Sequence, residues 1–304
     1  MNYSKPALTF PQQADLLISR GLIGDRDLMI ERLTSVNYYR LTGYWYPFRN
    51  PDDTFHTGTT FEQVWDRYVF DRRMKLLVMD AIERIEICVR TQLAYQHSHQ
   101  HGPMAYAVNA ATLPNLNSSK YAEFIAHVEE ETKRSREPFV EHFKIKYGTH
   151  QKYLPVWMVT EILSLGTVLS FFRGVDQKTK QDVAALFRVP DRVFDSWLLA
   201  LNTVRNICAH HSRLWNRELR VKPLMPADRK FPDWHVPVKV DNSRLFGILT
   251  ICRHCLRHIA PQTHWQQRVR ALIEEFPAIP MPNMGFPRDW EKCPIWTDDV
   301  PSAP

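Results

Sequence analysis

Apolar residues recur at three- and four-residue spacing along most of the chain, which is the period of amphipathic helices. The longest such segment spans about residues 61–97, and its apolar stripe consists of Leu76, Met79, Ile82, Ile85, Cys88, Val89 and Leu93. The same period predicts further helices at residues 10–20, 26–35, 121–147, 156–173, 178–187, 191–214, 243–259 and 264–275. Strand patterns are weak, and only residues 52–60 and 220–240 are expected to hold short β elements. We therefore predict a mostly α fold.

The positions of the prolines divide the chain into a helical part and an irregular end. No proline occurs from Asp52 to Gly102, whereas the last 82 residues hold 12 of the 21 prolines. Because proline interrupts helices, three segments are expected. They are an N-terminal helical segment with an aromatic motif at 1–60, a helical core at 61–222, and C-terminal helices with a proline-rich tail at 223–304. Trp290 and Trp296 predict that this tail is held against the protein surface.

Glycine is scarce, and its positions exclude two classes of nucleotide-cofactor enzyme. The chain holds 10 glycines, of which no two form a G-x-G pair and none precedes a lysine. The dinucleotide-binding fingerprint and the P-loop both require such glycines, because the backbone must approach phosphate closely there. We therefore expect no cofactor of these kinds and predict none.

The net charge of +6 and the pI of about 9.0 permit binding to nucleic acid or to an anionic surface without requiring it. Five cysteines are a sparse and odd set for this length, which suits a reducing cytosol better than a disulfide framework. The N-terminus lacks the apolar core of a signal peptide, and no stretch approaches 18 apolar residues. We expect a cytoplasmic protein that does not bind a membrane.

Side chains that carry chemistry concentrate between Leu201 and Arg220, in the sequence LNTVRNICAHHSRLWNRELR. Asn206 and His210 lie four residues apart on one helical face, and the long side chain of Arg205 reaches the same region. Arginine matches phosphate oxygens and histidine moves a proton near neutral pH, so these three residues suffice for a minimal metal-free ribonuclease site. The alternative is a solvated polar helix face, which is the commoner case for an isolated motif of this length.

Four sequence blocks resemble the abortive-infection (Abi) family of the D/F type, a family of bacterial phage-defence proteins. The blocks are SVNYYRLTGYWYPFR at 35–49, FDRRMKLLVMDAIERIEICVRTQL at 70–93, YLPVWMVTEILSLGTVLSFF at 153–172 and RNICAHHSRLWNR at 205–217. They stand in the family's order and cover most of residues 1–225. The resemblance implies membership of the HEPN superfamily, whose helical domains often carry an R-x4-6-H ribonuclease motif. It therefore implies an HEPN-like helical bundle in the core segment.

The resemblance assigns the catalytic roles residue by residue. Arg205 is the motif arginine, Asn206 is the polar residue after it, and His210 is the expected catalytic histidine. His211 also satisfies the motif spacing and is expected to act in a supporting or phosphate-contacting position.

Two further groups of residues are expected near this motif. The possible supporting residues are Glu83, Glu86 and Arg90, on the helix face expected to pack beside the motif, where an acidic residue would orient Arg205. Glu86 and Arg90 also have the spacing of a favourable helical ion pair. The expected RNA-binding residues are Arg213, Arg217 and Arg220, which would form a basic stripe along the RNA phosphates.

In the superfamily two such motifs usually meet across a dimer interface or between two domains of one chain, and no second R-N-x-x-x-H occurs in this sequence. The resemblance therefore implies a homodimeric, metal-independent endoribonuclease that acts in phage defence, with RNA as its partner. The alternative is a non-catalytic RNA-binding module that is regulated by, or sequesters, a small structured RNA. A protein-interaction scaffold is a third interpretation.

Other sequence features admit a chemical and a structural interpretation. Cys252 and Cys255 with His254 and His258 suggest zinc, but they lie in an apolar helical stripe and lack a second ligand pair, so a core role is favoured. His97, His99 and His101 could bind a metal ion, but they stand at a helix end, where the helix dipole favours histidine, so the structural role is favoured. The aromatic residues Tyr38, Tyr39, Tyr44, Trp45, Tyr46 and Phe48 could stack on RNA bases, but a core role is favoured for most of them.

Overall fold

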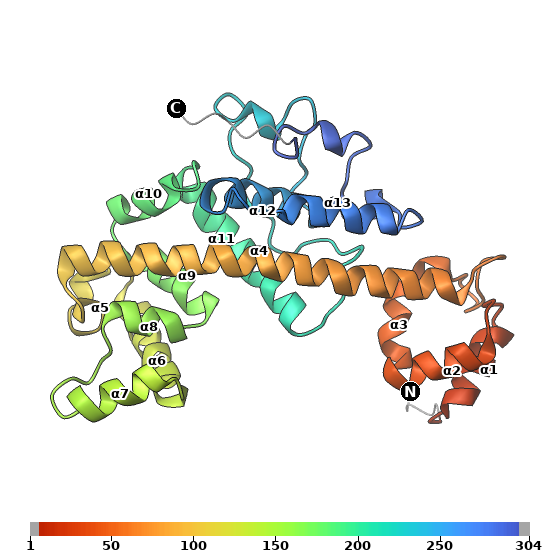
Figure 1. Cartoon of the computed structure of the whole chain (residues 1–304), viewed down its shortest axis with the longest axis horizontal. Helices are drawn as coiled ribbons and strands as arrows, with labels where there is room; N and C mark the ends of the chain where they lie inside the picture. Colours follow the sequence, from red (N-terminus) through yellow and green to blue (C-terminus); the bar gives the residue numbers. More distant parts are fainter. Residues whose placement is uncertain (1–5, 298–304) are drawn as a thin grey trace. The chain divides into compact units, whose positions relative to one another are not determined.

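The computed structural model describes residues 6–297, and helices dominate this range (Figure 1). No β-strand forms within it, and two isolated bridges pair Ile23 with Thr60 and Arg49 with Phe55. The mostly α prediction is confirmed. The expected β element at 52–60 is reduced to single bridged residues, and the one expected at 220–240 does not form. The segment 220–240 contains four prolines, which cannot donate the backbone hydrogen bonds of a ladder.

The described chain divides into two compact units. The first comprises the residues up to Leu76 together with Gln267–Pro280, and the second comprises Leu77–Gln266 together with the residues from Met281 onward. The helix α4 (Phe61–His101) begins in the first unit and continues into the second. These units combine distant parts of the sequence, whereas the predicted segments 1–60, 61–222 and 223–304 follow chain order.

The first unit places three short helices beside the start of α4. They are α1 (Phe10–Ser19), α2 (Arg26–Ser35) and α3 (Tyr38–Trp45), and α3 continues into a 3-10 turn, η1 (Tyr46–Phe48). The bounds of α2 match the prediction because the Asp25 side chain accepts from the N–H of Leu28 and fixes the helix start. Within the unit, the buried Tyr44 hydroxyl donates to Asp71 of α4 at 2.6 Å. This buried hydrogen bond anchors the aromatic motif.

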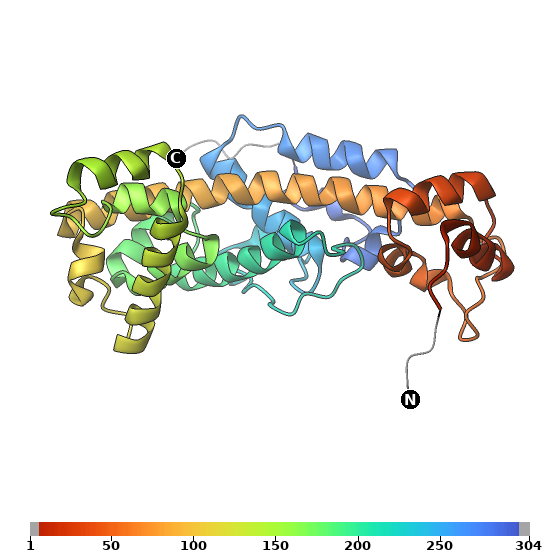
Figure 2. The ribbon, with the colours of Figure 1, turned by 90° about the horizontal axis from the view of Figure 1, so that it is seen from below.

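The second unit holds the remaining helices around the later part of α4. They are α5 (Ala105–Val108), α6 (Ser118–Arg134), α7 (Pro138–Tyr147), α8 (Val156–Ile162), α9 (Leu165–Gly174), α10 (Gln177–Ala185), α11 (Asp191–Ala209) and α12 (Leu245–Ile259), with the start of α13 (Trp265–Glu275). Helix α9 packs against α6 and α11, and α11 also contacts α10 and α12. Figures 1 and 2 show α11 passing beside α4. Aromatic rings of Phe172, Phe187 and Phe194 fill the space between these helices.

Two helices that the sequence period predicts as continuous are each broken in the structure. The predicted helix at 121–147 stops at Arg134 and resumes at Pro138, because a residue that precedes proline is disfavoured in the helical conformation. The predicted helix at 156–173 stops at Ile162, and Ser164 caps α9 by accepting from the N–H of Thr167 at 3.2 Å. Apolar spacing passes through both breaks unchanged, so it did not reveal them.

The apolar stripe of α4 is confirmed in its later part. Ile82, Ile85, Val89 and Leu93 are buried, whereas Leu76 is 62% exposed. Leu76 lies two residues before the buried Val78, which places it on the opposite side of the helix.

The proline-rich tail is held on the second unit, as predicted. Trp290 and Trp296 are buried, and the indole N–H of Trp296 donates to the Thr250 hydroxyl of α12 at 2.9 Å. Of the helices within residues 6–297, none combines the length and apolarity needed to cross a membrane.

Candidate functional site

The helix that carries the Arg-Asn-x-x-x-His motif ends inside the motif rather than at Leu214. Helix α11 stops at Ala209, and His210 is its C-cap residue. The N–H of Ser212 donates to the Ile207 carbonyl at 2.9 Å, and the N–H of His211 donates to the Cys208 carbonyl at 3.0 Å. This pair of bonds is the Schellman motif, which closes a helix through a residue in the left-handed conformation.

The left-handed residue is His211, with φ of 55°, where glycine is the usual choice. His210 keeps near-helical angles of φ −84° and ψ 11°, so its four-residue spacing from Asn206 still places both on the same side of α11. Both His210 and Asn206 are exposed. The backbone therefore separates the two adjacent histidines, and His210 is the one that continues the motif face.

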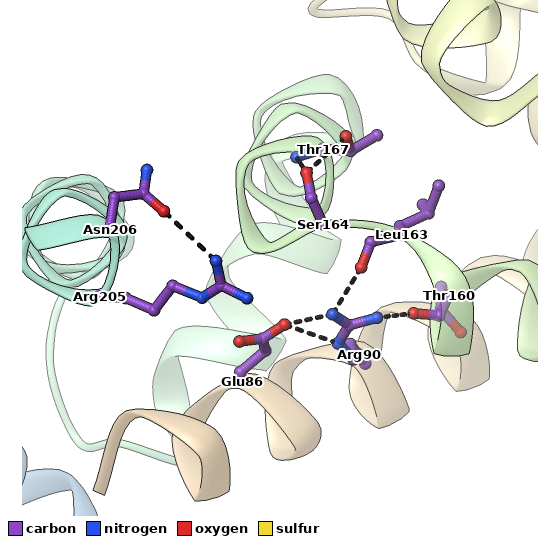
Figure 3. Close-up of polar contacts among 8 residues, drawn as sticks. All are labelled: Glu86, Arg90, Thr160, Leu163, Ser164, Thr167, Arg205 and Asn206. Atoms are coloured by element: carbon purple, nitrogen blue, oxygen red, sulfur yellow. Dashed lines mark hydrogen bonds and ion pairs between the residues drawn. The ribbon is translucent and has the colours of Figure 1, made fainter. Parts of the chain in front are cut away.

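Arg205 is half-buried, and its guanidinium Nη1 donates to Asn206 Oδ1 at 3.4 Å. Figure 3 shows the Arg205 side chain extending from α11 toward Glu86 of α4. The carboxylate of Glu86 lies between the guanidinium groups of Arg205 and Arg90 in this view. The structure thus brings together four of the expected residues: Arg205, Asn206, Glu86 and Arg90.

Arg90 joins α4 to the C-terminal end of α8 at the back of this site. Its guanidinium forms an ion pair with Glu86 and donates to the carbonyls of Thr160 and Leu163, the latter at 2.6 Å. These carbonyls lie at the C-terminal end of α8, where helix carbonyls lack intrahelical partners and the dipole favours a cation. The Arg90 and Glu86 side chains are only 10% and 14% exposed. The predicted ion pair is confirmed, and it is a buried pair that also fixes the break between α8 and α9.

Glu83 differs from the other supporting residues because its side chain is exposed on α4. Within the described part of the chain, no hydrogen bond or ion pair engages it. A role for Glu83 beside Arg205 therefore has no structural support, whereas the position of Glu86 supports the expected orienting role. That role stays a prediction.

Three polar residues on and before α9 and on α11 lie near the motif and were not predicted from the sequence. A Cβ placed on Gly166, in the first turn of α9, would lie 3.6 Å from the Asn202 amide nitrogen of α11. Asn202 stands four residues before Asn206, so helical spacing was the signal that could have included it. Ser164 and Thr167, whose hydroxyl oxygens lie 3.0 Å apart, have the spacing of an N-terminal cap.

The three arginines of the expected RNA-binding stripe lie beyond the end of α11, in a segment without regular structure. Buried Leu214, Trp215 and Leu219 anchor this segment, while Arg213 and Arg217 are half-buried and Arg220 is exposed. Nearby Glu218 pairs with Lys222 at 2.9 Å. The assignment of Arg213, Arg217 and Arg220 to RNA stays a prediction.

The cysteines and histidines of α12 lie in the core. Cys252 and Cys255 are fully buried, and burial raises the pKa of the Cys255 thiol well above its usual value. The His254 ring contacts the Phe187 carbonyl through Nε2 at 2.8 Å and packs against Trp197 and Trp234. Across residues 6–297, no group of three or more His, Cys, Asp or Glu side chains is arranged to hold a metal ion.

The N-terminal aromatic motif divides between core and surface. Tyr44 and Trp45 are buried, as expected for core residues, whereas Tyr39 and Tyr46 are 82% and 71% exposed. The histidines at the end of α4 also diverge: His97 is buried against Tyr106 and Phe171, whereas the exposed His99 packs on Tyr95.

The fold and this site together define an all-helical protein with an arginine-asparagine-histidine cluster at an exposed helix end. The family model described as Abi-like protein matches residues 31–216, which contain α3, α4, α11 and every residue of this cluster. The chain therefore belongs to the Abi-like protein family, and this membership assigns it to abortive-infection phage defence. Comparison with the curated proteins and with the solved structures finds no matching protein.

Proposed function

We propose that this Abi-like protein binds RNA and cleaves it at an HEPN-type endoribonuclease site formed by Arg205, Asn206 and His210. The observation that carries the proposal is the placement of Arg205. Its guanidinium bonds to Asn206 and extends toward Glu86, about one helical turn before the exposed His210. A guanidinium in this position presents its planar fork to phosphate oxygens, and the bond to Asn206 restricts its orientation.

The proposed reaction is an attack of the ribose 2′-OH on the adjacent phosphate, with departure of the 5′-oxygen of the next nucleotide. A proton moves from the attacking 2′-OH to the departing 5′-oxygen through His210, and Arg205 stabilises the negative charge that develops on the phosphate oxygens. The products are a 2′,3′-cyclic phosphate and a 5′-hydroxyl. This chemistry proceeds without a metal, because histidine moves the proton and arginine stabilises the charge.

The proposed assembly is a homodimer in the cytoplasm that pairs two motifs, since one chain contributes one Arg-Asn-x-x-x-His sequence. The exposed end of α11, with Asn206 and His210 at the surface, is accessible to a second copy. Light scattering of the purified protein should give about twice the chain mass of 35.8 kDa. A monomer at micromolar concentration would contradict the two-chain site.

The test of the activity is incubation of the purified protein with a mixed RNA pool, with and without EDTA, followed by analysis of the product ends. We expect cyclic-phosphate ends in both samples. Arg205→Ala should lose both RNA binding and cleavage, because it removes a charge-assisted contact. Arg192→Ala, an exposed arginine at the other end of α11, is the matched control and should retain both.

Binding without cleavage under every condition would favour the non-catalytic RNA-binding module over the ribonuclease. An absence of RNA binding by the wild-type protein would refute both.

A further inference from the structure

A cavity of about 440 Å³ opens in the first compact unit, remote in sequence from the arginine-histidine motif. Its lining includes the rings of Phe48 and Phe276 and the polar side chains of Gln63, Asp66 and Arg67. Cavities of about 300–1,000 Å³ with apolar walls and a few convergent polar groups are typical of small-ligand sites. We infer that this cavity binds a guanine base, with Asp66 accepting from the Watson–Crick edge and the aromatic rings packing on the base.

Neighbouring side chains hold the aromatic walls in place. The ring of Phe276 packs edge-on against Phe70 at 5.8 Å, and the Arg73 guanidinium lies over it at 5.6 Å. The Arg67 guanidinium lies 3.7 Å from the centre of the Phe48 ring. Because these rings are fixed before a ligand arrives, stacking a planar base on them costs little conformational entropy.

The carboxylate chemistry selects guanine among the bases. Within the described residues, no hydrogen bond or ion pair engages Asp66, whereas the Glu275 carboxylate is paired with Arg73. An ionised carboxylate only accepts hydrogen bonds and has room for two parallel donors. Guanine presents two adjacent donors, N1–H and the N2 amino group, on its Watson–Crick edge. Adenine and cytosine each place an acceptor next to their amino donor, which an ionised carboxylate would repel.

Donors for the other edge of guanine stand in the same cavity. Arg67 is buried in the wall with 8% exposure, and burial lowers its pKa to about 10, so it stays charged at neutral pH. Its guanidinium donates to the Tyr44 carbonyl at 3.4 Å through Nη1, which is one of five N–H donors. Gln63 uses its Oε1 to accept from the N–H of Thr60 at 3.0 Å, which leaves its amide NH₂ as a donor. Arginine and amide donors are the groups that pair with guanine O6 and N7.

This inference extends beyond the ribonuclease site, since the base could come from a free nucleotide or from an unpaired guanine in RNA. The test is isothermal titration calorimetry of the full-length protein with guanosine monophosphate and with adenosine monophosphate. We expect guanosine monophosphate to bind at least about ten-fold more tightly, the discrimination typical of one bidentate pair. Equal affinities, or no binding of either nucleotide, would overturn the inference.

The decisive variant is Asp66→Asn, which keeps the shape of an exposed side chain and so leaves folding intact. Asparagine offers one donor and one acceptor, so the preference should shift from guanosine to adenosine monophosphate. Asp27→Asn, at a side chain that is 95% exposed in the same unit and outside the cavity, is the matched control and should change neither affinity. An unchanged guanosine preference in Asp66→Asn would also overturn the inference.

The source of the base follows from a second titration with two nonauridine RNAs that carry one central guanosine or one central adenosine. Tighter binding of the guanosine RNA, lost in Asp66→Asn, would identify an RNA base as the ligand. Equal binding of both RNAs together with selective nucleotide binding would identify a free guanine nucleotide. RNA cleavage that depends on His210, without selectivity for guanine, would overturn the guanine site and leave the proposed function standing. Guanine selectivity without RNA binding would refute the proposed function and leave the guanine site standing.

Discussion

Replacing Arg90 with methionine tests the buried contacts by which Arg90 of α4 holds the C-terminal end of α8, where the chain breaks before α9. The substitution keeps the apolar stem of the side chain and removes the charge. It removes the cation that forms the ion pair with the Glu86 carboxylate, which is 14% exposed, and it removes the donor to the Thr160 and Leu163 carbonyls. Breaking a buried ion pair on one side costs about 3–5 kcal/mol, because an uncompensated charge remains. That loss is a large fraction of a typical stability of about 5–15 kcal/mol.

The measurement is urea unfolding monitored by far-ultraviolet circular dichroism. The dependence of the unfolding free energy on urea concentration is compared between variants. Arg84→Met is the matched control on the same helix: its partner Asp80 lies 3.3 Å away in an exposed pair, so the expected loss is below about 1 kcal/mol. The double variant Glu86→Gln/Arg90→Met should be more stable than Arg90→Met, because no buried charge remains. If Arg90→Met costs no more than Arg84→Met, the Glu86–Arg90 pair does not organise the site.

Three further predictions concern the helix end, the salt response and the buried histidine. His211→Gly should raise the free energy of unfolding by about 1 kcal/mol in urea titrations, because glycine adopts positive φ without a penalty; a loss of stability would show that the imidazole contributes more than the strain. Arg217→Ala and Arg220→Ala should each weaken RNA binding and lower the slope of the logarithm of the binding constant against the logarithm of the salt concentration by about 1. An unchanged slope would show that the replaced arginine does not contact phosphate. Burial lowers the pKa of His97 to about 4. Between pH 6.5 and 4 the unfolded chain therefore binds a proton at His97 that the folded chain does not bind, so the free energy of unfolding should fall as the pH drops through this range. His97→Phe should flatten that fall in pH-dependent melting curves, and an unchanged pH profile would contradict it.

Local signals predicted most helices well, because caps and periodicity act within a few residues. The helix at 26–35 has the predicted bounds, since Asp25 supplies its N-terminal cap. The helix at 191–214 was predicted too long, because nothing in the apolar period marks a histidine that adopts the left-handed conformation. The spacing also indicated an ion pair between Glu86 and Arg90, and the structure confirms it.

The rest of the candidate site depends on contacts between segments far apart in the sequence. Arg90 reaches the Leu163 carbonyl 73 residues away, and main-chain carbonyls leave no trace in the residue pattern. Glu83 and Glu86 look equivalent in the sequence, yet the packing of α4 leaves the first exposed and buries most of the second. The cavity beside Asp66 likewise combines α4 with a segment more than 200 residues later in the chain.

The measurement that tests the central claim most directly compares His210→Ala with His211→Ala in RNA cleavage and RNA binding. General acid–base groups contribute about 100- to 10,000-fold, so His210→Ala should lower the cleavage rate by that factor while the RNA affinity changes little. His211→Ala should keep most of the cleavage, because the left-handed turn separates His211 from the motif face. A melting curve of each variant controls for unfolding. Cleavage at the wild-type rate by a folded His210→Ala protein would contradict the proposed site.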